Sequence, residues 1–490
     1  MTRIKLKDKP YLGLLLLTFA ALCVHGYHPA AEDGEIYIPG IKKLLNPALY
    51  PFGSEFFLNH ARLTQFERLI AATVRISHLS FDLVVFVWYL VSVFLTLLAC
   101  WDWSVECFAE KESRFAAVTL VAALLTLPVA GTSLYIADQY LTPRSLALFA
   151  VLFGAQAAWR RQYLGFAAWS VFAILIHPLM AVFGITYGLL LAGMKQFGEV
   201  KEAQPMCRLA VFGSVGLLPP CSDAYHAAVQ TRSYFFILQW HWYECIGIFA
   251  PLLLLWWIGQ NKGKKHVPAV ALVSRSLVIY GLFYFIIALL LTIPAPLETL
   301  ARLQPMRSLQ LLYTFMIILG GGLLGKYVLK RHTLRWVILF LPLCAGMWVA
   351  QRQLFPTSPH IEWPGVAPNN NWLRAFEWIR SNTPSDALFA IDPNYMLIDD
   401  QHGFRAVAER SRLADAVKDS GAVTMFPEPP LAEHWLEEVT DQRRWPAFSA
   451  ADFYRLQRKY GVNWVVHLRP GVMGLSCPYE NEEVLVCRLN

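Results

Sequence analysis

Residues 11–23 read YLGLLLLTFAALC and, after four intervening residues, residues 28–40 read HPAAEDGEIYIPG. The first stretch is almost wholly apolar, whereas the second brings Glu32, Asp33 and Glu35 within four positions. A long apolar run without charges predicts a membrane helix, and the change in composition marks where that helix leaves the bilayer. The sequence therefore predicts a membrane protein with a group of carboxylates at the exit of its first span.

The composition of the whole chain supports this interpretation. Of the 490 residues, 56% are hydrophobic and 16% are charged, whereas a soluble chain carries about 25% charged residues. The net charge of +7 does not indicate a nucleic-acid partner, because basic residues in a membrane protein mostly set its orientation. The nine cysteines contain no CxxC pair, which disfavours a zinc ribbon. The composition is typical of a multi-pass α-helical membrane protein.

Apolar runs of about 20 residues recur in the first 354 residues and predict about eleven transmembrane helices. The predicted spans lie near residues 10–27, 81–100, 115–137, 143–158, 163–177, 178–194, 207–220, 243–259, 267–292, 306–325 and 335–352. The pair His177-Pro178 leaves a turn or a kink open at that point. GGGLLG, residues 320–325, fits a dinucleotide-binding pattern by letter, but it lies inside a span with no strand before it. We therefore assign it to close helix packing.

Basic residues fall mainly at one set of span ends. Eighteen lie there, against four in the intervening short loops, which are Arg144, Arg232, Arg302 and Arg307. The eighteen are Arg3, Lys5, Lys7, Lys9, Lys111, Arg114, Arg160, Arg161, Lys195, Lys201, Arg208, Lys262, Lys264, Lys265, Lys326, Lys330, Arg331 and Arg335. The positive-inside rule predicts that the span ends with these eighteen residues face the cytoplasm. We expect the chain to lie in the inner (plasma) membrane. The N-terminus is then cytoplasmic, the C-terminus is extracytoplasmic, and the first segment, which lacks an A-x-A site, is an uncleaved helix.

Two regions lack the pattern of membrane spans. Residues 29–80 form a long first outer loop, in which PGIKKLLNPAL and TQFERLIAATVRI place apolar residues opposite charged ones at helical spacing. Interfacial helices have this pattern. Residues 355–490 have mixed helix and strand signals and predict an extracytoplasmic α/β domain. We therefore divide the chain into a membrane domain, residues 1–354, and an outer domain, residues 355–490.

Short signals predict the elements of this outer domain. NNWLRAFEWIRSNTP predicts a capped helix, and DALFAIDP and VNWVVHL predict buried strands. FSAADFYRLQRKYG predicts a helix with a capping box of Ser449 and Asp452 that ends at Gly461. CPYENEEVLVC predicts a hairpin, in which Cys477 and Cys487 can form a disulfide in an oxidising compartment. The sequence leaves open whether they do.

Four groups of polar residues converge on the predicted outer side. They are the carboxylates after the first span, Asp138 in IADQYLTPRS after the third, His177 at the end of the fifth, and RLQPMRS before the tenth. The orientation rests on basic residues at the opposite ends, so this convergence is an independent signal. It predicts a functional site at the outer membrane surface. Asp223, His226 and QWHWYE are further candidates for an acceptor or sugar site, or belong to the interfacial aromatic belt.

Two arginines on this side occupy unusual helix positions. In LTPRS, Thr142 is a predicted N-cap and Pro143 the first helical residue, so Arg144 falls in the first turn. LQPMRS repeats the arrangement with Arg307. A cation there faces the positive end of the helix dipole at a cost of roughly 0.3–1 kcal/mol, which a bound anion would offset. Guanidinium groups suit phosphate, and we predict that Arg302 and Arg307, together with Arg144, hold one. Anchoring to lipid headgroups is the alternative.

These features resemble the GT-C class of integral-membrane glycosyltransferases, which includes protein mannosyltransferases, aminoarabinose transferases and oligosaccharyltransferases. Members use polyprenyl-phosphate-linked sugars and carry a catalytic acidic motif in the first outer loop, the place that EDGE occupies here. The resemblance implies Asp33 as the catalytic residue, with Glu32 or Glu35 next, and Asp138 at a second acidic position. It also implies His177 for the phosphate region. The chain has no WWD-type motif after the last span, which argues against an oligosaccharyltransferase.

The predicted function is therefore transfer of a sugar from a polyprenyl phosphate to an acceptor at the outer face. An aspartate can accept a proton from the attacking hydroxyl, or orient it, and arginines can stabilise the departing phosphate. The sequence requires no cofactor, although carboxylates beside a phosphate suit Mg²⁺ or Mn²⁺. The expected partners are a lipid-linked sugar donor and membrane lipids. The sequence specifies neither the sugar nor the acceptor.

A transporter or flippase for a lipid-linked or anionic solute is the alternative function. Transporters usually carry charged residues near the bilayer midplane, on broken helices. The central parts of the predicted spans carry almost no acids or bases. A non-catalytic assembly protein whose outer domain binds partners is a weaker alternative. The placement of charge thus favours the enzyme.

Overall fold

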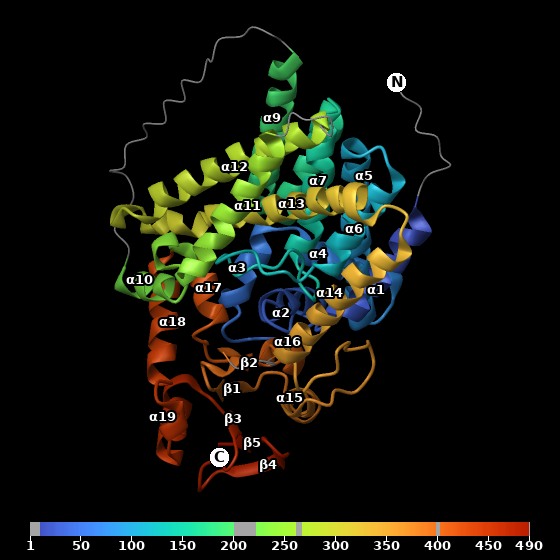
Figure 1. Ribbon diagram of the computed structural model, residues 1–490. Coiled ribbons are helices and arrows are strands. Elements are labelled where there is room, and N and C mark those ends of the chain that lie inside the picture. Colours follow the sequence, from blue (N-terminus) through green and yellow to red (C-terminus); the bar gives the residue numbers. More distant parts are fainter. Residues whose placement is uncertain (1–9, 200–221, 261–266, 398–401, 490) are drawn as a thin grey trace.

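The computed structural model describes residues 10–199, 222–260, 267–397 and 402–489, and most of them are helical (Figure 1). Helices coloured blue to yellow make up the upper and middle part of the view, and the red strands near the C-terminus gather at its lower end. Helix α9 (Pro178–Glu199) reaches the opposite end. The chain is thus a helical bundle with a small C-terminal sheet, as the sequence predicts.

Six helical stretches within the described ranges are long and apolar enough to cross a membrane. They are α5 (Phe81–Cys107), most of α9, α11 (Trp242–Gln260), α12 (Pro268–Thr292), the stretch Leu297–Leu329 around α13 (Leu309–Leu324), and α14 (Thr333–Leu354). The apolar helices α1 (Tyr11–His25) and α8 (Tyr163–Ile176) have 15 and 14 residues. At 1.5 Å per residue they are about 21–23 Å long, less than the bilayer core of about 30 Å. Eleven spans are therefore not confirmed, and the predicted span at 207–220 lies outside the described residues.

The predicted span at 115–137 is not one helix. Helix α6 (Lys111–Ala123) stops early, and the chain then forms a loop in which Pro128 bridges to Tyr135. Proline lacks an amide hydrogen and disfavours a helical residue before it. Gly131 packs so closely on Trp240 that a Cβ there would lie 2.6 Å from the indole. The loop leads into α7 (Pro143–Trp159) and so brings Asp138 close to the start of that helix.

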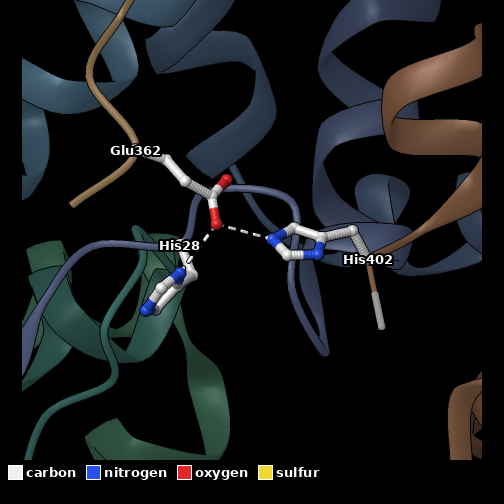
Figure 2. A group of neighbouring side chains, drawn as sticks. All are labelled: His28, Glu362 and His402. Atoms are coloured by element: carbon white, nitrogen blue, oxygen red, sulfur yellow. Dashed lines mark hydrogen bonds and ion pairs between the residues drawn. The ribbon is translucent and has the colours of Figure 1, made fainter. Parts of the chain in front are cut away.

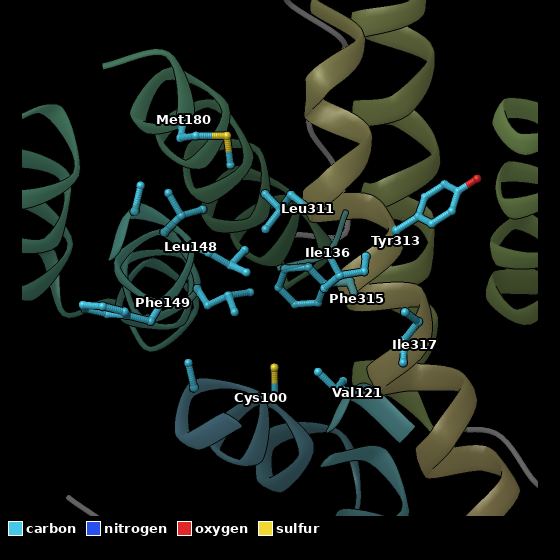
Figure 3. Close-up of a cluster of buried hydrophobic side chains, with 14 of the residues drawn as sticks. Cys100, Val121, Ile136, Leu148, Phe149, Met180, Leu311, Tyr313, Phe315 and Ile317 are labelled. Atoms are coloured by element: carbon cyan, nitrogen blue, oxygen red, sulfur yellow. The ribbon is translucent and has the colours of Figure 1, made fainter. Parts of the chain in front are cut away.

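Buried apolar side chains of α5, α6, α7, α9 and α13 form the core of the bundle (Figure 3). Three glycines of GGGLLG lie in close helix packing, as predicted: a Cβ on Gly321 or Gly325 would lie 2.8 Å from Ala116 of α6, and one on Gly322 would clash with the Phe108 ring, whereas Gly320 has no such neighbour. Helices α8 and α9 pack against each other on either side of His177. The pair His177-Pro178 therefore forms a turn between two helices.

The first outer loop folds into α2 (Gly34–Leu45), α3 (Glu55–Leu63) and α4 (Phe66–Ser77). Helices form at both predicted amphipathic stretches, and α2 packs on α3 and α4. The Gln65 amide donates a hydrogen bond to the Leu175 carbonyl oxygen over 2.7 Å, which ties α4 to the end of α8. The loop is thus a fixed layer between the bundle and the outer domain (Figure 1).

A five-stranded sheet organises the outer domain, in the order β2-β1-β3-β5-β4. Strand β1 is parallel to β2 and β3, whereas β5 is antiparallel to β3 and β4. The elements are α15 (Asn371–Asn382), β1 (Leu388–Ile391), α16 (Phe404–Ala408), β2 (Ser411–Arg412), α17 (Lys418–Met425), α18 (Pro429–Asp441), α19 (Ala450–Tyr460), β3 (Trp464–Leu468), β4 (Ser476–Glu480) and β5 (Val484–Arg488). Helix α10 (Asp223–Gln230) packs on α17 and α18.

Short 3₁₀ and π turns connect these elements. They are η3 (Ser233–Phe235), η4 (Ile237–Gln239), η5 (Ala295–Leu303), η6 (Pro305–Ser308), η7 (Gly325–Leu329), η8 (Tyr395–Leu397) and η9 (Trp445–Ala447). The local predictions for the outer domain are confirmed. Ser449 and Asp452 form the capping box of α19, and Gly461 ends it with φ +78°. Cys477 and Cys487 form a disulfide between β4 and β5.

A buried group of five charged residues joins the first outer loop to the outer domain; we call it the seam cluster. It consists of Glu35, Arg405, Arg412, Asp415 and Asp419, all of them buried. Arg412 Nε lies 3.0 Å from Glu35 Oε1, and Arg405 Nη1 lies 2.8 Å from Asp419 Oδ1. Arg412 also pairs with Asp415. Two arginines thus hold three carboxylates, and the contact fixes the start of α17 against the start of α2.

Candidate active site

Two neighbouring cavities, of about 430 and 90 Å³, lie where the first outer loop, the bundle and the outer domain meet. Six residues line both of them, and we call these the charged junction. They are Asp33, Arg144, Arg232, Tyr234, Arg307 and Lys418. Five separate regions of the chain contribute to the junction, which makes it the strongest candidate for a site among the described residues.

Asp33 lies between two cations of the junction. Its Oδ2 is 2.9 Å from Arg144 Nη1, and its Oδ1 is 3.4 Å from Lys418 Nζ. Burial by itself raises the pKa of a carboxyl group, but Lys418 and Arg144 outweigh it and hold the pKa of Asp33 far below its ordinary value. The side chain keeps 26% of its surface exposed. Asp33 is therefore an ionised carboxylate at every physiological pH, and it faces the cavities.

Local structure at the start of α7 holds Arg144 in place. Thr142 caps the helix with a capping box to Ser145, and Pro143 is its first residue, as predicted. Arg144 Nη2 lies 3.0 Å from Asp138 Oδ2, and the Thr142 hydroxyl donates to the same oxygen over 3.0 Å. The unfavourable position of Arg144 at the positive end of the helix dipole is thus offset by carboxylates of the chain itself.

Arg307 and Arg232 have no carboxylate partner among the described residues. The Arg307 guanidinium stacks over the Tyr234 ring, 5.3 Å from its centre, and its Nε is buried without a hydrogen-bond acceptor. Arg232 donates only to the Val417 carbonyl oxygen and to the Ser420 hydroxyl. Buried polar groups of this kind are rarely left without a partner. Both guanidinium groups are therefore placed to receive an anion that enters the cavities.

The net charge of the residues that line the cavities also favours binding of an anion. Arg144, Arg232, Arg307 and Lys418 give four positive charges, against the three carboxylates Glu32, Asp33 and Asp138. The net charge of +1 lies in a partly enclosed space, where its field is stronger than at an open surface.

His177 and His60 line the smaller cavity. Burial lowers the pKa of His177 well below its ordinary value, and the neighbouring Arg144 lowers it further. His177 is therefore neutral at neutral pH, and its Nδ1 accepts a hydrogen bond from the Met180 amide. Because Nδ1 accepts, the proton of the neutral ring lies on Nε2, which can donate to an oxygen in the cavity.

Two of the predicted site residues lie elsewhere. Arg302, on η5, donates to the Met425 carbonyl oxygen over 3.1 Å and does not line either cavity. Glu35 is fully buried in the seam cluster. Glu32, by contrast, lines the larger cavity and pairs with Lys418. The structure thus gathers Asp33, Glu32, Asp138, Arg144, Arg307 and His177 around the cavities, and places Arg302 and Glu35 outside them.

Sequence reasoning missed Lys418, Arg232 and Tyr234 as site residues. Arg232 entered only as one of the few basic residues in the outer loops, and Lys418 lies in an outer-domain stretch without a motif. Lys418 is 7% exposed, and a lysine is seldom so buried unless it is paired. Its partners are 385 and 386 positions away in the chain, so only the folded structure could identify it.

The predicted divalent cation does not fit the acidic residues at the cavities. Asp33 and Asp138, the two carboxylates that would share Mg²⁺ or Mn²⁺, already share the guanidinium of Arg144. Lys418 takes the other oxygen of Asp33. A hard cation between the two carboxylates would face this guanidinium at close range, which is unfavourable. We therefore assign charge stabilisation at this point to Arg144 and Lys418.

A family profile described as a domain of unknown function (DUF6798) matches residues 370–419, the part of the outer domain that carries both arginines of the seam cluster and Lys418. No curated protein matches the chain.

Similar solved structures include three of the Archaeoglobus fulgidus oligosaccharyltransferase. One, tethered to an acceptor peptide with the sequence NVT, has 13% identity and a TM-score of 0.47, over 94% of this chain and 69% of the other. The apo form has 12% identity and a TM-score of 0.40, over 94% and 70%. The complex with Zn and sulfate has 12% identity and a TM-score of 0.45, over 93% and 67%. At these values the likeness does not by itself establish a shared fold or activity.

Proposed function

We propose that the chain is an integral-membrane glycosyltransferase that moves a sugar from a polyprenyl phosphate to an acceptor at the outer membrane face. The observation that carries the proposal is that Asp33 and Arg307, which lie at opposite ends of the membrane part in sequence, line the same two cavities. One supplies a carboxylate and the other a guanidinium without an anionic partner. In sugar transfer from a phosphate, the carboxylate acts on the acceptor side of the reacting carbon and the guanidinium acts on the phosphate side.

The donor's phosphate binds at Arg307 and Arg232 in this proposal. Both guanidinium groups lack a carboxylate partner among the described residues, and arginine binds phosphate oxygens through paired N–H groups. The isoprenoid tail extends toward the apolar helices, and the sugar lies in the larger cavity. As the bond between the anomeric carbon and the phosphate oxygen breaks, charge grows on the phosphate and the arginines stabilise it.

Asp33 orients the acceptor and stabilises the sugar. The acceptor oxygen attacks the anomeric carbon, the leaving phosphate takes the electron pair of the broken bond, and the acceptor's proton passes to the released phosphate or to water. A carboxylate with so low a pKa is a poor proton acceptor. It can still accept the hydrogen bond of the attacking hydroxyl and offset the positive charge that develops on the sugar ring. Arg144 and Lys418 fix its direction.

The test compares two arginines that lie five residues apart. Arg307→Met removes the guanidinium without a carboxylate partner and should lower kcat/KM for a polyprenyl-phosphate-linked sugar by about 10²–10³-fold. Arg302→Met removes only the hydrogen bond to the Met425 carbonyl oxygen and should leave turnover close to wild type. Transfer is followed with purified protein in lipid nanodiscs.

Equal losses in both variants would contradict the assignment of the phosphate to Arg307. The absence of transfer or hydrolysis with any lipid-linked sugar, together with counter-flow of the solute into vesicles, would instead indicate a transporter.

A further inference from the structure

His28, Glu362 and His402 form a second cluster of ionisable side chains (Figure 2). Glu362 Oε1 lies 2.7 Å from His28 Nδ1 and 2.7 Å from His402 Nε2. One nitrogen or oxygen of each residue lies within 4.8 Å of the others. The three atoms thus converge on one point from three different parts of the chain.

The backbone holds these three segments together independently of the side chains. Tyr27 and Ile361 form a parallel bridge, in which the Glu362 amide donates to the Tyr27 carbonyl oxygen over 3.0 Å. Ala31 and His402 form an antiparallel bridge. These backbone bridges therefore hold three segments in fixed positions before any ligand binds: the exit of α1, the segment after α14 and the outer domain. Such preorganisation is what a metal site requires of its supporting residues.

The negative charge of Glu362 needs a positively charged partner. Among the described residues, only histidines lie close enough to be one. The Glu362 side chain is 14% exposed, and its ion pairs among the described residues are to His28 and His402 alone. Glu35, which is also buried, faces two arginines instead. A carboxylate buried without a permanent cation is costly. A divalent ion at the point where the three side chains meet would remove this cost.

The chemistry of the ligands selects the metal. Two imidazole nitrogens and one carboxylate oxygen suit zinc and its neighbours, whereas Mg²⁺ prefers a set of oxygens. Phe355 stacks on the His28 ring with 3.6 Å between ring centres and an interplanar angle of 12°, so one side of the cluster is apolar. Glu362 also lines a cavity of about 550 Å³, which gives an ion a route from solvent. We propose that His28, Glu362 and His402 bind one zinc-class ion, which ties the exit of α1 to the outer domain.

The experiment measures metal content, so it is independent of the proposed sugar transfer. The full chain, purified in detergent without a histidine tag, is treated with EDTA, incubated with micromolar Zn²⁺ or Mg²⁺, and passed over a desalting column before elemental analysis. We expect about one equivalent of zinc per chain and no retained magnesium. Zinc should also raise Tm, because it binds only the folded protein.

Three variants test the assignment. His402→Ala and Glu362→Gln should each lower retained zinc from about one equivalent to about none, and should abolish the rise in Tm. Glu362→Gln keeps the shape of the side chain, so it guards against a variant that fails to fold. His434→Ala is the matched control: the two nitrogens of His434 face different carboxylates, Glu55 and Glu438, and cannot join them on one ion. Zinc absent from the wild type, or retained by both site variants, would overturn the proposal.

Discussion

The replacement of Asp33 by asparagine tests the chemistry of the junction most directly. The amide has the same shape but no charge, so it keeps an acceptor toward Arg144 and loses the attraction to Arg144 and Lys418. A hydrogen bond to a charged group contributes about 1.5–3 kcal/mol. Arg144 retains Asp138 and Lys418 retains Glu32. We therefore expect folding to lose about 1–2 kcal/mol, less than the 3–5 kcal/mol of an ion left buried alone.

The effect of Asp33→Asn on turnover should be much larger than its effect on folding. A group that orients the nucleophile and offsets charge in the transition state contributes about 10²–10³-fold, which is about 2.7–4 kcal/mol at 1.36 kcal/mol per decade. The assay measures kcat with a polyprenyl-phosphate-linked sugar in nanodiscs, alongside Tm by fluorescence. Because the pKa of Asp33 is far below its ordinary value, the pH–rate profile of the wild type should have no limb from this residue above pH 4 or so.

Glu35→Gln is the control for the same acidic motif. Glu35 lies two positions further on, fully buried and outside both cavities. It is one of three carboxylates that share two arginines, so its neutralisation leaves the seam cluster balanced, and kcat should stay close to that of the wild type. Wild-type turnover by Asp33→Asn in a folded protein, or an equal loss in both variants, would refute the role that we assign to Asp33.

Three further predictions concern the outer domain. Lys418→Met should lower kcat with little change in membrane insertion, because Lys418 is the outer domain's contact with Asp33; transfer by the purified variant checks it. Hydrogen bonds to two glutamates raise the pKa of His434 to about 10, so its stabilisation is fully present below pH 6.5 and is lost as pH rises through about 10; the difference in Tm between the wild type and His434→Gln should vanish above that pH. Serine at both Cys477 and Cys487 should destabilise the outer domain by about 2–3 kcal/mol, since the disulfide closes a short loop; chemical denaturation checks it.

Local signals in the sequence were sufficient where the structure depends on neighbouring residues. The cap at Thr142, the capping box at Ser449 and the helix end at Gly461 were all predicted, because each depends on a few adjacent positions. The loop after α6 was not predicted. Its apolar composition reads as a membrane helix, but Pro128 and the close contact between Gly131 and Trp240 prevent one.

The candidate site could be predicted only in part, for a geometric reason. Asp33 and Glu35 are two positions apart at the start of α2, and residues at that spacing do not face each other on a helix. One points to the cavities and the other to the seam cluster. Arg302 and Arg307 diverge in the same way across two 3₁₀ turns. Spacing identified the right segments, but which side chain of each reaches the cavities depends on the fold.

The seam cluster limits how substrates reach the junction. Lifting the outer domain off the first loop would break the ion pairs of Glu35 with Arg405 and Arg412, although both arginines would keep Asp415 and Asp419, at the cost of the buried contacts across the seam. A lid that swung open in every turnover would incur this cost each time. We therefore expect the outer domain to act as a fixed roof, with donor and acceptor passing through side openings that exist before either arrives.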